Sequence, residues 1–160
     1  MAQDREMLIA WLNDAYAMER AQIPVLENHA KDAAAFPAIR ARDEQHLAET
    51  RRHVELVEQC ITQLGEKPSQ AKGLMGRMMG TVQSVVTGPA EDELVKNFLM
   101  DFASEHLEIA SYTALIAGAR ELGEEQIATT CETILRDEQA MAGWLQENLP
   151  MAVRQTLRAD

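Results

Sequence analysis

Glutamates lie within segments whose other residues predict a buried helix. The stretch SEHLEIASY (residues 104–112) carries Glu105 and Glu108, although Phe98 and Ile109 make the same helical face apolar. A carboxylate in an apolar interior is costly to ionise, so it becomes protonated, pairs with a cation or binds a metal ion. Several such carboxylates in one place would therefore predict a cation site.

The other three long amphipathic segments each place a glutamate near their midpoint, on or beside the face that the apolar residues define. In two of them the glutamate lies at the centre of the apolar arc, and in the third it lies toward the edge. The midpoints of antiparallel helices meet at one level of a bundle, so these carboxylates should converge. The expected group contains Glu19, Glu49, Glu105 and Glu138, with Glu108 to one side.

Two histidines share the apolar arc on which Glu49 lies. His46 precedes Glu49 by one turn and His53 follows it by one turn. Either ring can be a metal ligand or a neutral core residue hydrogen-bonded to Glu49 or to a backbone group. Two divalent cations would neutralise four carboxylates. Carboxylate and imidazole donors suit iron or manganese, with zinc as an alternative. We expect His106 and Tyr112 to hydrogen-bond to ligands without binding metal.

Four segments with apolar residues at helical spacing must position these side chains. Pro37 suits a first helical turn, Gly65 and Gly123 suit helix ends, and Pro24 predicts a kink. We expect one domain over residues 1–160, with helices over 4–33, 37–64, 89–122 and 124–148.

The links between these segments favour one topology. Short links make the first two helices an antiparallel pair and the last two another, whereas residues 66–88 form a long crossover that contains a short helix. The sequence therefore predicts an all-α fold, a ferritin-like antiparallel four-helix bundle, in preference to a simple up-down bundle. The residues after 148 are expected to form a short C-terminal tail helix.

Composition excludes several classes of function. The formal charge of -11 argues against a nucleic-acid-binding surface or a polybasic membrane contact. The N-terminus lacks the pattern of a signal peptide, and no segment is apolar enough to span a membrane. The two cysteines have no CxxC spacing and form no disulfide framework. We expect a cytoplasmic protein.

Several stretches resemble the ferritin-like superfamily, and within it the YciF-like stress-response family. They are DAYAMER, HLAETRRHVEL, EHLEIASY and ETILRDEQ, in family order along nearly the whole chain. The resemblance implies a rubrerythrin-like dinuclear site, commonly in a homodimer. It implies ligand roles for Glu19, Glu105 and Glu108, and bridging carboxylates at Glu49 and Glu138.

The chain departs from this pattern where ferritin-like sites usually carry Glu-x-x-His. Arg52 follows Glu49 by three residues and Met141 follows Glu138 by three, so His46 or His53 must supply the imidazole. We expect an iron or manganese protein that reacts with dioxygen or peroxide, with electrons from an external donor. The alternative is a non-enzymatic dimeric bundle, a stress or interaction module with a structural or vacant metal site.

Overall fold

The computed structural model describes residues 2–69 and 92–158. These residues form four long helices: α1 (Ala2–Asp32), α2 (Pro37–Gln63), α4 (Glu93–Glu121) and α5 (Glu125–Thr156). A 3-10 turn, η1 (Ala33–Ala35), joins α1 to α2. The described residues include no strand, and the predicted all-α four-helix architecture is confirmed.

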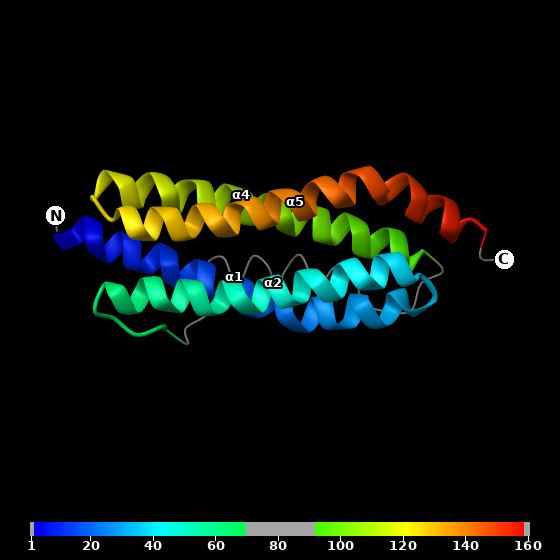
Figure 1. The fold of residues 1–160 in the computed structure, drawn as a ribbon, viewed down its shortest axis with the longest axis horizontal. Helices are drawn as coiled ribbons and strands as arrows, with labels where there is room; N and C mark the ends of the chain where they lie inside the picture. The colour runs from blue at the N-terminus through cyan, green and yellow to red at the C-terminus, as the bar shows by residue number, and fades with distance from the viewer. Residues whose placement is uncertain (1, 70–91, 159–160) are drawn as a thin grey trace.

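The helices form two antiparallel pairs, α1 with α2 and α4 with α5 (Figure 1). α1 also packs on α4, and α2 packs on α5, which closes the bundle. The α1–α2 and α4–α5 links lie at opposite ends, and α2 ends at the end opposite to the start of α4 (Figure 1). The described helices therefore run in the directions that the predicted bundle topology requires. The short helix predicted in the crossover falls outside the described residues.

Glycine ends α2 and α4, as predicted. Gly65 and Gly123 adopt φ values of 79° and 75°, which side chains with a Cβ rarely tolerate. After α2, the amide of Gly65 donates to the Thr62 carbonyl and the amide of Glu66 donates to the Ile61 carbonyl. The same pair of hydrogen bonds follows α4 at Gly123. These are Schellman ends, which satisfy carbonyls that the helix leaves without partners.

Both interior prolines lie within continuous helices. α1 passes through Pro24, and α5 passes through Pro150 to end at Thr156. The prediction of a helix ending at 148 with a separate tail helix is therefore corrected. A proline inside a helix costs about 3 kcal/mol, but Ala152 is fully buried and Met151 packs on the adjacent core. That burial offsets the hydrogen bond that Pro150 cannot make.

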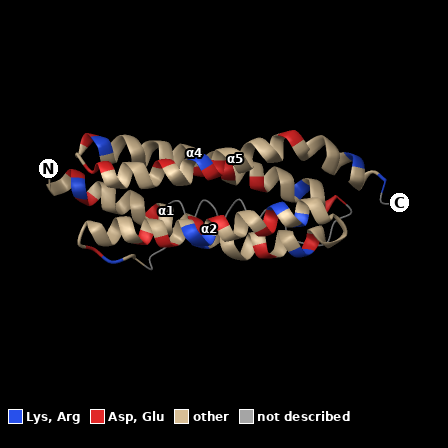
Figure 2. Ribbon diagram, in the orientation of Figure 1, with Lys and Arg blue, Asp and Glu red and all other residues tan. Residues whose placement is uncertain are grey.

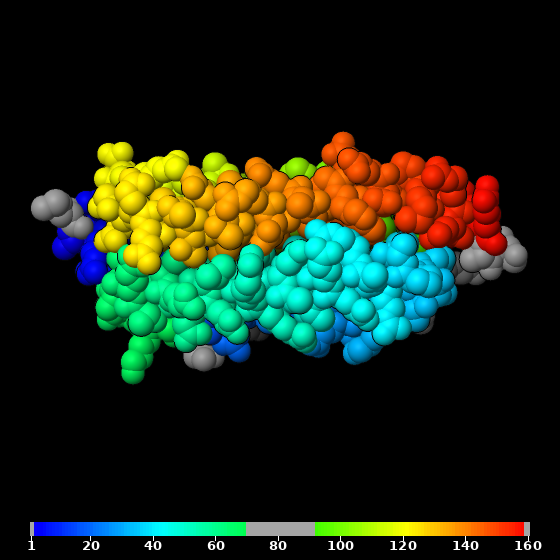
Figure 3. All heavy atoms as spheres, in the orientation of Figure 1, coloured from blue at the N-terminus to red at the C-terminus, as the bar shows by residue number. Residues whose placement is uncertain are grey.

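The apolar interior is divided into two parts. The larger core lies toward the start of α1 and includes Leu12, Val57 and Ile134. The smaller one lies toward the α1–α2 turn and includes Ile39 and Phe98. Buried polar side chains occupy the level between them. In the space-filling view α2 and α5 meet along a seam that covers this level on one face (Figure 3).

Charged residues are distributed along all four helices, and acidic ones lie on each of them (Figure 2). Within the described residues, no helix combines the length and hydropathy needed to cross a bilayer.

Candidate metal centre

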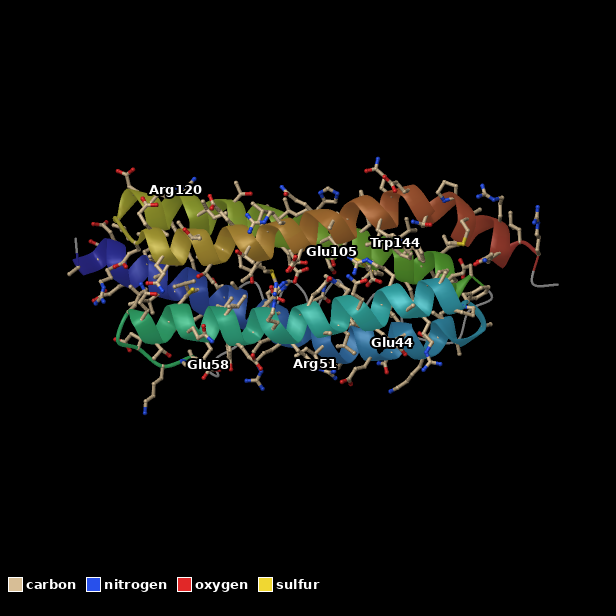
Figure 4. All side chains as sticks on the ribbon, in the orientation of Figure 1. Glu44, Arg51, Glu58, Glu105, Arg120 and Trp144 are labelled. Atoms are coloured by element: carbon tan, nitrogen blue, oxygen red, sulfur yellow. The ribbon has the colours of Figure 1, made fainter. Side chains whose placement is uncertain are left out.

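Four of the five predicted glutamates are buried at the middle of the bundle. Each has an exposed fraction of 0 or 1%. α1 contributes one of them, α4 two and α5 one, while α2 contributes two equally buried histidines. Figure 4 shows Glu105 pointing between the α1–α2 and α4–α5 pairs. The buried group is Glu19, His46, His53, Glu105, Glu108 and Glu138.

Two sets of three ligand atoms lie within this group. One set comes from Glu19, His53 and Glu138, and the other from His46, Glu105 and Glu138; within each set the atoms are within 4.8 Å of one another. Glu138 belongs to both. Its Oε1 lies 2.9 Å from Nδ1 of His53, and its Oε2 lies 3.8 Å from Nε2 of His46. The two oxygens of Glu138 thus face different sets of ligand atoms.

Several of these buried atoms lack hydrogen-bond partners. They include both carboxylate oxygens of Glu138, one oxygen each of Glu19, Glu105 and Glu108, and Nδ1 of His53. Each such atom costs about 1–3 kcal/mol when it stays unsatisfied. Nδ1 of His53 and Oε1 of Glu138 also approach each other to 2.9 Å without hydrogen-bond geometry. A ring that has given up its extra proton would direct the Nδ1 lone pair into the space that this oxygen faces. These residues fit metal ions.

Carboxylates outside the group orient both imidazole rings. Nε2 of His53 lies 3.1 Å from Asp137, and Nδ1 of His46 lies 3.2 Å from Glu49. An ionised carboxylate only accepts, so the ring nitrogen that faces it carries the hydrogen. The opposite nitrogen of each ring faces the buried group. Carboxylate–histidine pairs of this kind orient imidazole ligands in metal sites.

The structure places Glu49 outside both sets of ligand atoms. Its side chain is 21% exposed and accepts hydrogen bonds from Arg42, Gln45 and His46. Burial alone would raise the pKa of Glu49, but the hydrogen bonds from His46, Gln45 and Arg42 lower it to about 2. Thr50 lies inward instead and is 1% exposed. Thr50 precedes His53 by three residues, which is the position of the glutamate in a Glu-x-x-His motif. α2 thus carries a hydroxyl at this position instead of a carboxylate.

Protons balance the charge of the buried group in the metal-free protein. Burial alone would lower the pKa of each histidine, but Glu105 raises the pKa of His46 well above its usual value. The nearby Glu138 and Glu19 raise the pKa of His53 to about 10. Burial, followed by repulsion among neighbouring carboxylates, raises the pKa of Glu108 and Glu138.

Of the two residues predicted to hydrogen-bond to the ligands, Tyr112 reaches the buried group and His106 does not. Tyr112 is fully buried, and its hydroxyl donates to Oε1 of Glu19 at 2.5 Å. Burial, together with the charge of Glu19, raises the pKa of Tyr112, so the phenol stays protonated as a donor. His106 lies on the exposed side of α4 with its ring edge-on to Phe102, 4.4 Å between centroids. It does not reach the buried group.

A second buried polar cluster lies one helical turn away and was missed by sequence reasoning. His29 pairs with Asp101 at 2.9 Å, and Asp43, like Asp101, is 4% exposed. Asp43 precedes His46 by three residues and Asp101 precedes Glu105 by four, so the same helical periodicity could have identified both. Burial and, next in size, repulsion from Asp101 raise the pKa of Asp43 to about 7. The positive charges of His29, His46 and Arg42 oppose this rise.

Substitution of Asp43 by asparagine is expected to stabilise the metal-free protein at alkaline pH. Between pH 3.8 and about 7 the folded state holds a proton on Asp43 that the unfolded state has lost, so this group lowers stability as pH rises. Removing the carboxylate should add up to about 4 kcal/mol to the free energy of unfolding at pH 8, and about half of that at pH 5.5. Urea titrations at both pH values measure the effect.

The neighbouring exposed Glu44, which pairs with Arg40, supplies the control. Glu44→Gln should change stability by no more than about 0.5 kcal/mol at either pH. A loss of stability in Asp43→Asn at pH 8 would contradict the expectation, because it would mean that His29 and Arg42 stabilise the ionised form.

Comparison with known proteins identifies the family and the fold. The model of the family described as "Domain of unknown function (DUF892)" matches residues 3–158. A protein of Xanthomonas campestris pv. campestris is 38% identical over 97% of this chain and 96% of its own, with a TM-score of 0.82. The stress protein YciF of E. coli is 23% identical over 96% of this chain and 99% of its own, also at 0.82.

A ferritin-like, diiron-carboxylate protein of Bacillus anthracis strain Ames is 20% identical over 93% of this chain and 99% of its own, with a TM-score of 0.76. At the identities of these last two structures the likeness concerns the fold. The family match extends over nearly the whole sequence, and the fold is the one that the YciF-like resemblance predicted. The chain therefore belongs to the DUF892 family and has the ferritin-like fold.

Proposed function

We propose that this protein binds two metal ions at the middle of its bundle, iron or manganese in preference to zinc. One observation carries the proposal: both oxygens of Glu138 lack hydrogen-bond partners, and each faces a different set of buried ligand atoms. Glu138 would bridge the ions. Glu19 with His53 would hold one ion, and Glu105 with His46 would hold the other.

Charge and donor chemistry support the same assignment. Glu19, Glu105, Glu108 and Glu138 carry four negative charges when ionised, which two divalent cations neutralise. Oxygen and imidazole donors together suit iron and manganese better than magnesium or calcium. Glu108 is buried beside the other carboxylates and would be a further ligand for either ion.

Bound iron or manganese would supply one-electron chemistry toward peroxide or dioxygen. The chain's own residues define the conditions for it. Tyr112 holds Glu19 through one oxygen and leaves the other free, while Asp137 and Glu49 orient the two rings. The two apolar cores on either side exclude water. α5 places the buried Met141, rather than a histidine, three residues after Glu138, so both imidazoles of the centre come from α2.

The E. coli relative is described as a stress protein and the Bacillus anthracis relative as a diiron-carboxylate protein. By analogy we assign this chain a role in a stress response. Its assembly as a homodimer, its cytoplasmic location and its use of an external electron donor remain predictions.

A non-enzymatic bundle is the second candidate. The observation that favours it is the close pairing of His46 with Glu105, 2.9 Å apart, which neutralises part of the buried charge without metal. In that case the glutamates and histidines would serve the fold alone, or any bound metal would be structural.

Metal analysis followed by a peroxide assay separates the two candidates. The protein, purified without chelator and reloaded with ferrous iron under anaerobic conditions, should hold two ions per chain and consume added hydrogen peroxide. Protein that stays folded but binds no iron would contradict the proposal. Protein that binds two ions and leaves peroxide unchanged would retain the metal site but support a structural role for it.

A further inference from the structure

The chain's two cysteines lie against each other inside the larger core. Cys60 of α2 is 3% exposed and Cys131 of α5 is fully buried. Their side chains are close enough to hydrogen-bond to each other. Both are free thiols, although they are far apart in the sequence. The packing of α2 on α5 alone brings them together.

The pair occupies a defined place relative to the candidate metal centre. Cys60 follows His53 by seven residues, and Cys131 precedes Glu138 by seven, so each cysteine shares a helical face with a proposed ligand. Because α2 and α5 are antiparallel, the step from His53 to Cys60 and the step from Glu138 to Cys131 run in the same direction along the bundle. Two turns correspond to about 10.5 Å, and the intervening Val57 and Ile134 are fully buried.

We infer that Cys60 and Cys131 form an internal two-electron redox pair, which closes to a disulfide and supplies the reducing equivalents for peroxide reduction at the centre. The inference rests on the proposed function. The balance is one hydrogen peroxide and two thiols giving one disulfide and two waters. The O–O bond and both S–H bonds break, the S–S bond forms, and the two thiol protons end on water. The sulfurs are oxidised and the peroxide oxygens are reduced.

The local environment of the two sulfurs suits this role. The thiol of Cys131 donates to the sulfur of Cys60. This hydrogen bond lowers the pKa of Cys60, although burial opposes the change. The same hydrogen bond, together with burial, raises the pKa of Cys131. The two thiols therefore differ, as an attacking and a resolving cysteine do. Both are closed off from solvent, so an oxidant in bulk water reaches them slowly. Oxidation should then depend on the centre two turns away.

Counting thiols after peroxide treatment tests the inference. Iron-loaded and metal-free protein receive more than one equivalent of hydrogen peroxide, because two ferrous ions by themselves reduce the first equivalent. The samples are then quenched in acid, unfolded and alkylated for mass analysis. The chain has two cysteines in all, so the count is unambiguous. Iron-loaded protein should lose both alkylation sites within one chain, at least about tenfold faster than metal-free protein. Iron content is measured on the same samples.

Single variants supply the controls. Cys60→Ser and Cys131→Ser should each keep the remaining thiol free within the monomer, and Cys60→Ala guards against a folding defect from a buried hydroxyl. Protein that binds no iron would refute the proposed function and this inference with it. Protein that binds iron, consumes peroxide and keeps two alkylatable thiols would overturn this inference alone. Equal rates of disulfide formation with and without iron would also overturn it.

Discussion

Glutamine in place of Glu138 is expected to remove both metal ions from the protein. Among the described residues, the two sets of buried ligand atoms share this side chain alone, through its two oxygens. An amide keeps the shape but loses the charge and one acceptor. Both affinities should fall by well over the roughly 10- to 100-fold that loss of an outer hydrogen-bonding partner costs. Metal content after dialysis, measured by mass spectrometry, reports the loss.

The same variant should remain folded. Ionised Glu138 is opposed by burial and by the charge of Glu19, as its raised pKa indicates, and glutamine removes this penalty. The metal-free variant is therefore expected to unfold at the wild-type temperature or above it, as followed by circular dichroism. This separates a lost ligand from a lost fold.

Glu49→Gln is the matched control, because it makes the same chemical change on the facing helix. Glu49 touches the ring of His46 from outside the buried group, so this variant should retain both ions with affinities reduced by about 10- to 100-fold. Loss of only one ion in Glu138→Gln, or of both in Glu49→Gln, would contradict the assignment and restore Glu49 as a bridging ligand.

Metal loading is expected to give the largest gain in stability. A ligand that binds only the folded state adds about 4 kcal/mol when its free concentration is about 1,000 times its dissociation constant. For a chain of this size each such site corresponds to a rise in melting temperature of about 8–16 °C. The gain arises because the cations satisfy buried oxygens that are unpaired in the metal-free protein. Anaerobic thermal unfolding with ferrous iron or manganese measures it.

Magnesium and chelator provide the comparisons for this experiment. Magnesium carries the same charge but prefers a full oxygen shell that retains water, so sites with a histidine ligand should bind it weakly. Addition of a chelator should return the melting temperature to the metal-free value, and Glu138→Gln should show no shift with iron. An equal shift with magnesium would indicate general screening of the protein's negative charge instead of a specific centre.

The inward glutamates were predictable because helical periodicity is a local property. Glu19, Glu105 and Glu138 each repeat at the spacing of the apolar residues around them, and the structure buries all three. The helix pairs followed from the short lengths of the links within them. Pro150 did not predict the end of α5 correctly. The helix continues beyond it because Ala152 and its neighbours pack in the core.

Glu49 was expected to face inward but lies outside the buried group because α2 is rotated by one residue from the predicted orientation. His46, Thr50, His53, Val57 and Cys60 follow one another at spacings of three and four, and all are buried. Glu49 lies one position, about 100°, away from this line. The apolar arc of this helix is broad, so a helical-wheel projection does not distinguish position 49 from position 50 as the inward one. Thr50 is uncharged and gives no sign of a ligand position. Packing against α1 and α5 set the rotation of α2.

By itself, then, the sequence determined which faces of α1, α4 and α5 turn inward and that carboxylates occur on them, because both depend on residues within one or two turns. For α2 it determined the inward face only to within one residue. Only the tertiary structure decided which side chains meet across helices: His53 with Asp137, His46 with Glu105, and Cys60 with Cys131. Those pairings depend on the axial offset and rotation of one helix against another. Dense side-chain packing over the whole interface sets these two quantities, and no local pattern encodes them.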